Sequence, residues 1–175
     1  MIANVEERWR LEEGYRISVF SEQDAVSEKE VLDLWQREDV VPEYEAKRRI
    51  HEVLLVATHQ GGELVGVSTA YLEQSLQLRM DLWYYRAYVA EAHRMSNVAV
   101  TLALMGREHL QQRYVNGKDP RGAGIVYEVE NEGLKRIFDD AVWYPADVTF
   151  IGETRRGAHV RVRYFPGALA PEPTA

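Results

Sequence analysis

Residues Tyr84–Tyr114 read YYRAYVAEAHRMSNVAVTLALMGREHLQQRY. An aromatic, β-prone run ends at Val89, a polar turn follows over residues 91–97, and a helix pattern then begins with Val98. Its apolar positions are Val98, Leu102, Met105, Leu110 and Tyr114. The first N–H groups of a helix have no acceptor within it, and the helix dipole adds partial positive charge there. The stretch therefore predicts a strand, a turn and a helix N-terminus that bind an anion such as a pyrophosphate.

Arg94 is the charged residue that strengthens this prediction. Its guanidinium is a planar fork of donors that suits phosphate. Ser96, two residues on, can donate from its hydroxyl or cap the helix. The alternative is a solvated arginine at a helix start.

The composition describes an acidic globular protein. A net charge of −7 and a pI near 5.3 do not favour a nucleic-acid partner. The absence of cysteine excludes disulfides, thiolate zinc sites and a cysteine nucleophile, and the five histidines show no metal-ligand spacing. We see neither an apolar run that could span a membrane nor the apolar core of a secretion signal. We therefore expect a cytoplasmic protein that needs no metal.

Periodicity and turn residues divide the chain into short elements. Strands are expected at residues 15–20, 53–58, 64–71, 78–89, 125–129, 148–153 and 160–165. Helices are expected from Ser27, which opens the capping box SEKE, from Pro42, over 98–114 and over 134–142. Residues 1–14 are expected to form an arm or a short helix, 15–166 a single domain, and 167–175 a flexible tail. This order indicates a mixed α/β sheet rather than a regular βαβ alternation.

A short motif accompanies this order of elements. The frame V-x-P-x-x-R-x-x-G-x-G/A reads Val89-Ala-Glu91-Ala-His-Arg94-Met-Ser-Asn97-Val-Ala99. Val89, Arg94 and Ala99 are in register, whereas Glu91 replaces the proline and Asn97 replaces the first glycine. With the element order, this motif resembles the GNAT acyltransferase superfamily over residues 15–165, as a divergent member.

A second GNAT signature is matched in part. The asparagine that follows the fifth strand is Asn131, but the tyrosine expected seven residues later is Phe138, and the family's Gly-Phe is Val142-Trp143. The resemblance implies an α/β (α+β) fold with a mixed, mostly antiparallel sheet. We expect about six to seven strands and about four helices.

The resemblance also implies acetyl-CoA, or another acyl-CoA, as cosubstrate. Backbone N–H groups of the turn would bind its pyrophosphate, and the fourth strand would pair with its pantetheine arm. Asn97 suits a position that needs φ > 0, although its side chain could crowd a phosphate. The residues that the resemblance places at the cofactor are Tyr88, Val89, Arg94, Met95, Ser96, Asn97, Val98, Ala99, Asn131 and Phe138.

The expected chemistry is acyl transfer to an amine, which needs placement, a base and a proton donor. Glu128 and Glu130 are the preferred bases, because alternation places them on one face of a strand, about 7 Å apart. Both could equally be ordinary exposed residues, and the other base candidates are Asp81, Glu91 and His93. The resemblance implies that the acid is often the tyrosine that Phe138 replaces, and phenylalanine has no proton to give. The acid is then absent, or it is Tyr127, Tyr144 or water.

The acceptor is sought in the acidic and aromatic segment that follows Trp35. Its residues Trp35, Asp39, Glu43, Tyr44 and Glu45 would favour a cationic amine. The aromatic fourth strand, with Trp83, Tyr84, Tyr85 and Tyr88, could form an acceptor wall, a core or a homodimer contact. The arginines at 155, 156, 161 and 163 could grip the cofactor's 3′-phosphate, bind a partner or do neither.

Three functions remain open from the sequence. The first is an acetyl-CoA-dependent N-acyltransferase that acts on a small-molecule or protein amine. The second is a GNAT-fold module that binds CoA without turnover, which Phe138 favours. The third is an interaction protein, in which the cleft that would hold the cofactor in a GNAT protein contacts a protein partner instead.

Overall fold

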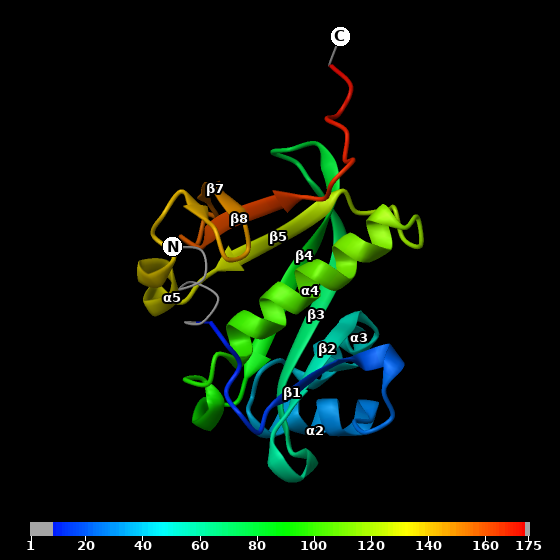
Figure 1. The fold of residues 1–175 in the computed structure, drawn as a ribbon, viewed down its shortest axis with the longest axis vertical. Helices are drawn as coiled ribbons and strands as arrows, with labels where there is room; N and C mark the ends of the chain where they lie inside the picture. The colour runs from blue at the N-terminus through cyan, green and yellow to red at the C-terminus, as the bar shows by residue number, and fades with distance from the viewer. Residues whose placement is uncertain (1–8, 174–175) are drawn as a thin grey trace. The chain divides into compact units, whose positions relative to one another are not determined.

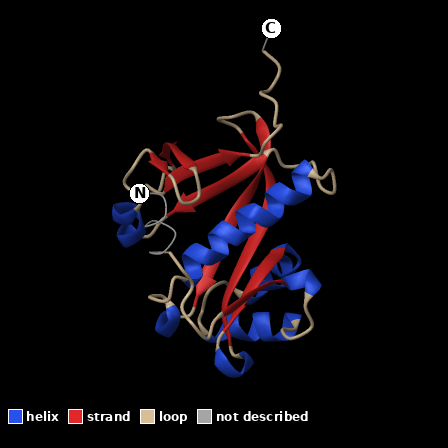
Figure 2. Cartoon of the chain, viewed as in Figure 1, coloured by secondary structure: helices blue, strands red, loops and turns tan. Residues whose placement is uncertain are grey.

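The computed structural model describes residues 9–173. Within that range the chain forms eight strands in one mostly antiparallel sheet, in the order β1-β2-β3-β4-β5-β8-β7-β6 (Figures 1 and 2). The strands are β1 (Arg16–Val19), β2 (Val53–Thr58), β3 (Leu64–Ser75), β4 (Met80–Val89), β5 (Gly124–Val129), β6 (Val142–Trp143), β7 (Val148–Glu153) and β8 (His159–Tyr164). The α-helices are α2 (Glu28–Arg37), α3 (Glu43–Arg49), α4 (Val98–Val115) and α5 (Glu132–Ile137). The mixed sheet and the four helices confirm the predicted fold class, and the eight strands exceed the six to seven expected.

The contacts divide the chain into two units. The first unit contains the described residues up to Ala70 together with Ala87–Gly106, and the second contains Tyr71–Arg86 and the described residues from Arg107 onward. Strands β3 and β4 and helix α4 each contribute residues to both units. The expected single domain over residues 15–166 stays a prediction.

In the first unit, β2 is buried on both of its faces. Val56 packs with Leu34 and Trp35 of α2, while Leu55 and Ala57 pack in the cluster that holds the start of α4. This two-sided burial explains why residues 53–58 read as a continuous apolar run. The predicted strand has the observed bounds.

Helix α4 approaches this sheet closely at Gly66. A Cβ there would lie 3.3 Å from side-chain atoms of Ala57, Val98 and Leu102. The β2–β3 register shifts nearby, between Ala57 and Thr58. Glycine thus lets the first turn of α4 pack tightly on the strands, which positions the predicted anion-binding turn.

In the second unit, the parallel pairing of β4 with β5 runs from Trp83 opposite Ile125 to Tyr85 opposite Tyr127. Leu82 of β4, Val126 of β5 and Val162 of β8 form a buried cluster. Arg161 of β8 is only 2% exposed, and its guanidinium donates to the carbonyl oxygens of Phe138 and Asp140.

The prediction for the last helix was wrong. We expected a helix over residues 134–142, whereas α5 ends at Ile137 and residues 142–143 form strand β6. The carbonyl of Phe138, which a helix over residues 134–142 would use internally, instead accepts a hydrogen bond from Arg161, as does the carbonyl of Asp140. A tertiary contact therefore ends the helix early.

The chain ends bear on two further predictions. Residues 1–8 and 174–175 lie outside the described range, and residues 9–14 contain no helix. Residues 167–173 have neither helix nor strand, and their flexibility stays a prediction. Among residues 9–173, none of the helices combines the length and apolar character of a membrane span.

Candidate functional site

The turn between β4 and α4 lies in the first unit and has the predicted strand–turn–helix order. β4 ends at Val89, a short 3₁₀ turn covers Glu91–His93, and α4 begins at Val98. Asn97 has a φ of 61°, the left-handed conformation in which an asparagine can replace glycine. Ser96 is 3% exposed, and its hydroxyl donates to the carbonyl of His93. Met95 is 92% exposed beside them.

The first turn of α4 has the backbone N–H groups that an anion would need. The carbonyl of Asn97 accepts from Thr101 N at 2.9 Å, which is the first bond of the helical pattern. Val98, Ala99 and Val100 therefore present N–H groups without acceptors inside the helix. The side-chain amide of Asn97 donates to the carbonyl of Arg10 at 3.0 Å. This contact draws the Asn97 side chain toward the N-terminal segment.

Arg94 lies at the start of this turn with an exposed side chain. Its Nε donates to the carbonyl of Val89 at 3.1 Å, and its guanidinium carbon lies 5.8 Å from the ring centre of Tyr88. Tyr88 donates to Glu38 at 3.0 Å. Burial raises the pKa of Tyr88, and Glu38 raises it further. The hydrogen bond from Tyr88, with help from Arg37, lowers the pKa of Glu38.

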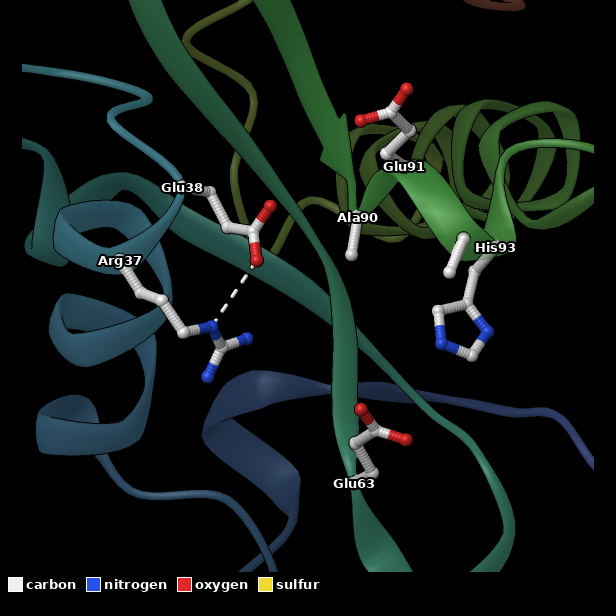
Figure 3. Close-up of a pocket in the computed structure, with 7 residues that line it drawn as sticks. Arg37, Glu38, Glu63, Ala90, Glu91 and His93 are labelled. Carbon is white, nitrogen blue, oxygen red and sulfur yellow. Dashed lines mark hydrogen bonds and ion pairs between the residues drawn. The ribbon is translucent and has the colours of Figure 1, made fainter.

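A pocket of about 520 Å³ adjoins the turn in the same unit (Figure 3). It is lined by Arg37, Glu38, Glu63, Ala90, Glu91, Ala92 and His93. Arg37 donates to Glu38 at 3.2 Å, which leaves Glu63 and Glu91 as further carboxylates around the pocket. Three carboxylates disfavour an anion, so the pocket does not suit a phosphate.

The second unit holds a cluster of aromatic and charged side chains on β3, β4 and β5. The rings of Tyr71 and Tyr84 stack with centres 5.5 Å apart, and the guanidinium of Arg86 lies 4.2 Å from the centre of the Tyr71 ring. Partial burial raises the pKa of Glu128, and the charges of Glu130 and Glu73 raise it further, whereas Arg86 lowers it. Glu128 thus has the environment of a carboxylate with strengthened basicity.

Similarity to known proteins appears only at the level of structure. No protein-family model matches the sequence, and no curated protein matches it significantly. An acetyltransferase of the GNAT family from Streptococcus pneumoniae matches with a TM-score of 0.58 and 9% identity, over 86% of this chain and 99% of that one. The chain has the GNAT fold.

Two further structures agree. NAA60 of Arabidopsis thaliana, solved in complex with acetyl-CoA, has a TM-score of 0.58 and 12% identity, over 86% of this chain and 99% of that one. The ribosomal-protein-S5-alanine acetyltransferase from Vibrio fischeri has a TM-score of 0.56 and 7% identity, over 91% of this chain and 98% of that one. At such identities the likeness establishes the fold alone.

The other residues expected at a GNAT site lie in the second unit. Asn131 caps α5, since its Oδ1 accepts from Leu134 N at 3.0 Å. The ring of Phe138 packs against Trp143 with centres 4.3 Å apart. Tyr144 is 76% exposed in a turn after β6 and is not among the groups that influence Glu128. Burial raises the pKa of Tyr127, whose ring contacts Tyr85.

The cluster of the second unit also contains residues that the sequence analysis did not select, namely Tyr71, Glu73 and Arg86. The predicted third strand ended at Tyr71, whereas β3 continues to Ser75. The alternation of Tyr71, Glu73 and Ser75 was the available signal, because it places the three side chains on one face. In the part of the chain that the structure describes, no three His, Asp or Glu side chains group as metal ligands.

Proposed function

We propose that this protein transfers an acetyl group from acetyl-CoA to an amine. The observation that carries the proposal is the β4–α4 turn, in which Asn97 adopts the left-handed conformation open to glycine at the start of a helix. A helix leaves its first N–H groups without an internal acceptor. Acetyl-CoA is the ligand in the NAA60 structure, which has the same fold. Arg94 and the N–H groups from Val98 to Val100 would hold the pyrophosphate.

Glu128 is the proposed base. An amine that arrives as an ammonium ion must lose a proton before its nitrogen can attack the thioester carbonyl. The carboxylate of Glu128 would accept that proton, because burial, Glu130 and Glu73 raise its pKa. The new C–N bond forms as the C–S bond breaks, and the thiolate leaves with a proton from water or a side chain. Tyr144 stays a proposed donor, and its exposure would let it move toward a substrate.

The acceptor is proposed to be cationic. Glu73 and Glu130 lie close enough to Glu128 to raise its pKa, and Arg86 close enough to lower it, so three carboxylates share this surface with the guanidinium of Arg86. Such a surface attracts an ammonium group, on a small molecule or on a protein. We further propose that the protein is cytoplasmic and forms a homodimer. Sedimentation at micromolar concentration tests the dimer.

The experiment is acetyl transfer measured as thiol release from acetyl-CoA with a panel of primary amines. Glu128→Gln should lower kcat by about 10²-fold or more, with unchanged affinity for acetyl-CoA in calorimetry. Replacing Glu22, an exposed carboxylate in the first unit, by Gln is the matched control. Full activity of Glu128→Gln would remove Glu128 from the mechanism.

The second candidate is a GNAT-fold module that binds CoA without turnover. The observation that favours it is the packing of Phe138, which has no proton to donate, against Trp143. Tight binding of acetyl-CoA with no thiol release for any amine would select this candidate.

A further inference from the structure

The described part of the N-terminal segment, Trp9–Tyr15, lies against the β4–α4 turn of the first unit. Asn97 Nδ2 donates to the carbonyl of Arg10 at 3.0 Å, and Glu12 N donates to the carbonyl of Ser96 at 3.5 Å. Tyr15 Oη and His93 Nδ1 share a hydrogen bond of 2.7 Å. Three contacts thus connect residues that are more than 75 positions apart in the sequence.

Apolar packing holds the same segment in place. Leu11 and Tyr15 pack against the buried cluster that contains Val89 and Val98, the residues on either side of the turn. The Tyr15 ring also lies 4.5 Å from the ring centre of His59 and 5.6 Å from that of His93. The segment is therefore anchored to the end of β4 and to the start of α4.

The contacts use a particular set of groups on the turn. The segment bonds to the carbonyl of Ser96, the side-chain amide of Asn97 and the imidazole of His93. None of these is a backbone N–H group of the first turn of α4, which an anion would need. These three contacts therefore fit a segment that supports the turn.

We propose that the segment Trp9–Tyr15 is a positioning element for the acetyl-CoA site, and that Tyr15 and Asn97 are its positioning residues. This inference rests on the proposed function. The segment holds Asn97 in its left-handed conformation and fixes the His93 end of the turn, so that the N–H groups of Val98, Ala99 and Val100 point at the pyrophosphate. The asparagine that replaces the family's glycine thereby gains a role, as the anchor of the N-terminal segment.

Two variants remove the contacts without disturbing the backbone. Asn97→Gly keeps φ > 0 accessible and deletes the amide that reaches Arg10, and Tyr15→Phe deletes only the hydroxyl that reaches His93. Each should raise the Kd for acetyl-CoA about 2- to 10-fold, the usual effect of one hydrogen bond, and leave kcat at saturation unchanged. Tyr164→Phe, at the end of β8, is the matched control and should bind like the wild type.

Amide hydrogen exchange of the ligand-free protein gives a second readout. Both variants should speed exchange in peptides that cover residues 94–102, and Tyr164→Phe should not. Acetyl-CoA should also slow exchange of Trp9–Tyr15 in the wild type.

The outcomes separate the two proposals. If the wild type binds acetyl-CoA and Asn97→Gly binds it as tightly or more tightly, the positioning role is overturned and the proposed function stands. If the wild type does not bind acetyl-CoA, the proposed function fails, and exchange at residues 94–102 then decides the positioning role. Unchanged exchange in both variants would overturn that role as well.

Discussion

The groups around Glu128 shift the pKa of its carboxyl in directions that experiment can test. Burial raises its pKa first, then Glu130 and Glu73, and Arg86 opposes them. If Glu128 is the base, the acidic limb of the pH–rate profile reports this pKa. The neighbours can then be tested by the direction in which each shifts that limb.

Glu130→Gln should move the acidic limb of kcat/KM to lower pH, because it removes a charge that raises the pKa of Glu128. Arg86→Gln should move the limb to higher pH, because it removes the opposing charge. The two profiles, recorded with one amine at constant ionic strength, check both signs. Shifts in the same direction would contradict the assignment of Glu128.

The same raised pKa predicts a gain in stability for Glu128→Gln. A carboxyl whose folded pKa lies above its unfolded value stabilises the fold below the unfolded pKa, about 4.3. That contribution is lost as the pH rises through the folded pKa. At pH 7 the neutral glutamine should therefore raise the midpoint of urea unfolding, and at pH 3 the difference should vanish. A lower midpoint at pH 7 would show that the carboxylate stabilises the fold.

Arg94→Ala should weaken acetyl-CoA binding by about 1.5–3 kcal/mol, the loss expected for a charged hydrogen bond to phosphate. Calorimetry measures the change, with Arg48→Ala as the control, since Arg48 of α3 forms an ion pair with Glu52. Unchanged affinity would mean that Arg94 does not bind the phosphate and only donates its hydrogen bond to the carbonyl of Val89.

Sequence reasoning at this scale succeeded where the information is local. The tolerance of Asn97 for φ > 0 follows from residue type. The shared face of Glu128 and Glu130 stays a prediction, since β5 ends at Val129. The contact of Asn97 with Arg10 could not be predicted, because the two residues are 87 positions apart. The roles of the remaining site residues stay predictions.

At the scale of elements, α2 shows how a local motif specifies a helix start. Ser27 Oγ accepts from Glu30 N at 3.3 Å, and the Glu30 carboxylate accepts from Ser27 N at 2.8 Å, as the capping box predicts. Leu34 and Trp35 then face the core. The cap therefore fixes where the buried face of the helix begins.

Ser27→Ala should lower the free energy of unfolding by about 1 kcal/mol, because the first N–H groups of α2 lose their acceptor. Chemical denaturation measures the change. Ser27→Asp keeps a capping oxygen and should remain close to the wild type; equal loss in both variants would argue against capping.

The elements differ in how well the sequence predicts them. The predicted bounds of β2 and β7 are those observed, and α4 extends one residue beyond its prediction, because hydrophobic pattern and turn residues set these ends. The bounds of α5 were predicted wrongly and β6 was missed, because Arg161 ends the helix from another strand and because Val142–Trp143 is a strand only through pairing with β7.

At the scale of the whole molecule, the order of helices and strands along the chain predicts the class of fold. It does not predict the order of the strands within the sheet. The succession of helices and strands indicates a mixed sheet. The GNAT resemblance implies that this sheet is mostly antiparallel, with about six to seven strands and about four helices. The place of β8 between β5 and β7 depends on pairing between distant segments, which periodicity does not encode.

Acetyl-CoA at about 100 times its Kd should raise the thermal midpoint by about 5–10 °C, since a ligand of the folded state stabilises a domain of this size by mass action. Differential scanning fluorimetry measures the shift, with ATP at equal concentration as the control. Equal shifts for both ligands would indicate a general anion effect.

The position of β8 also bears on how the protein is made. Residues 159–164 are synthesised after β5 and β7, yet they pair with both of these strands. Until they leave the ribosome, two strands of the second unit have unpaired edges, which other chains can recognise. A ribosome that stalls before codon 159 should therefore release a chain prone to aggregate, whereas one that stalls after Tyr164 should release a chain able to complete its sheet.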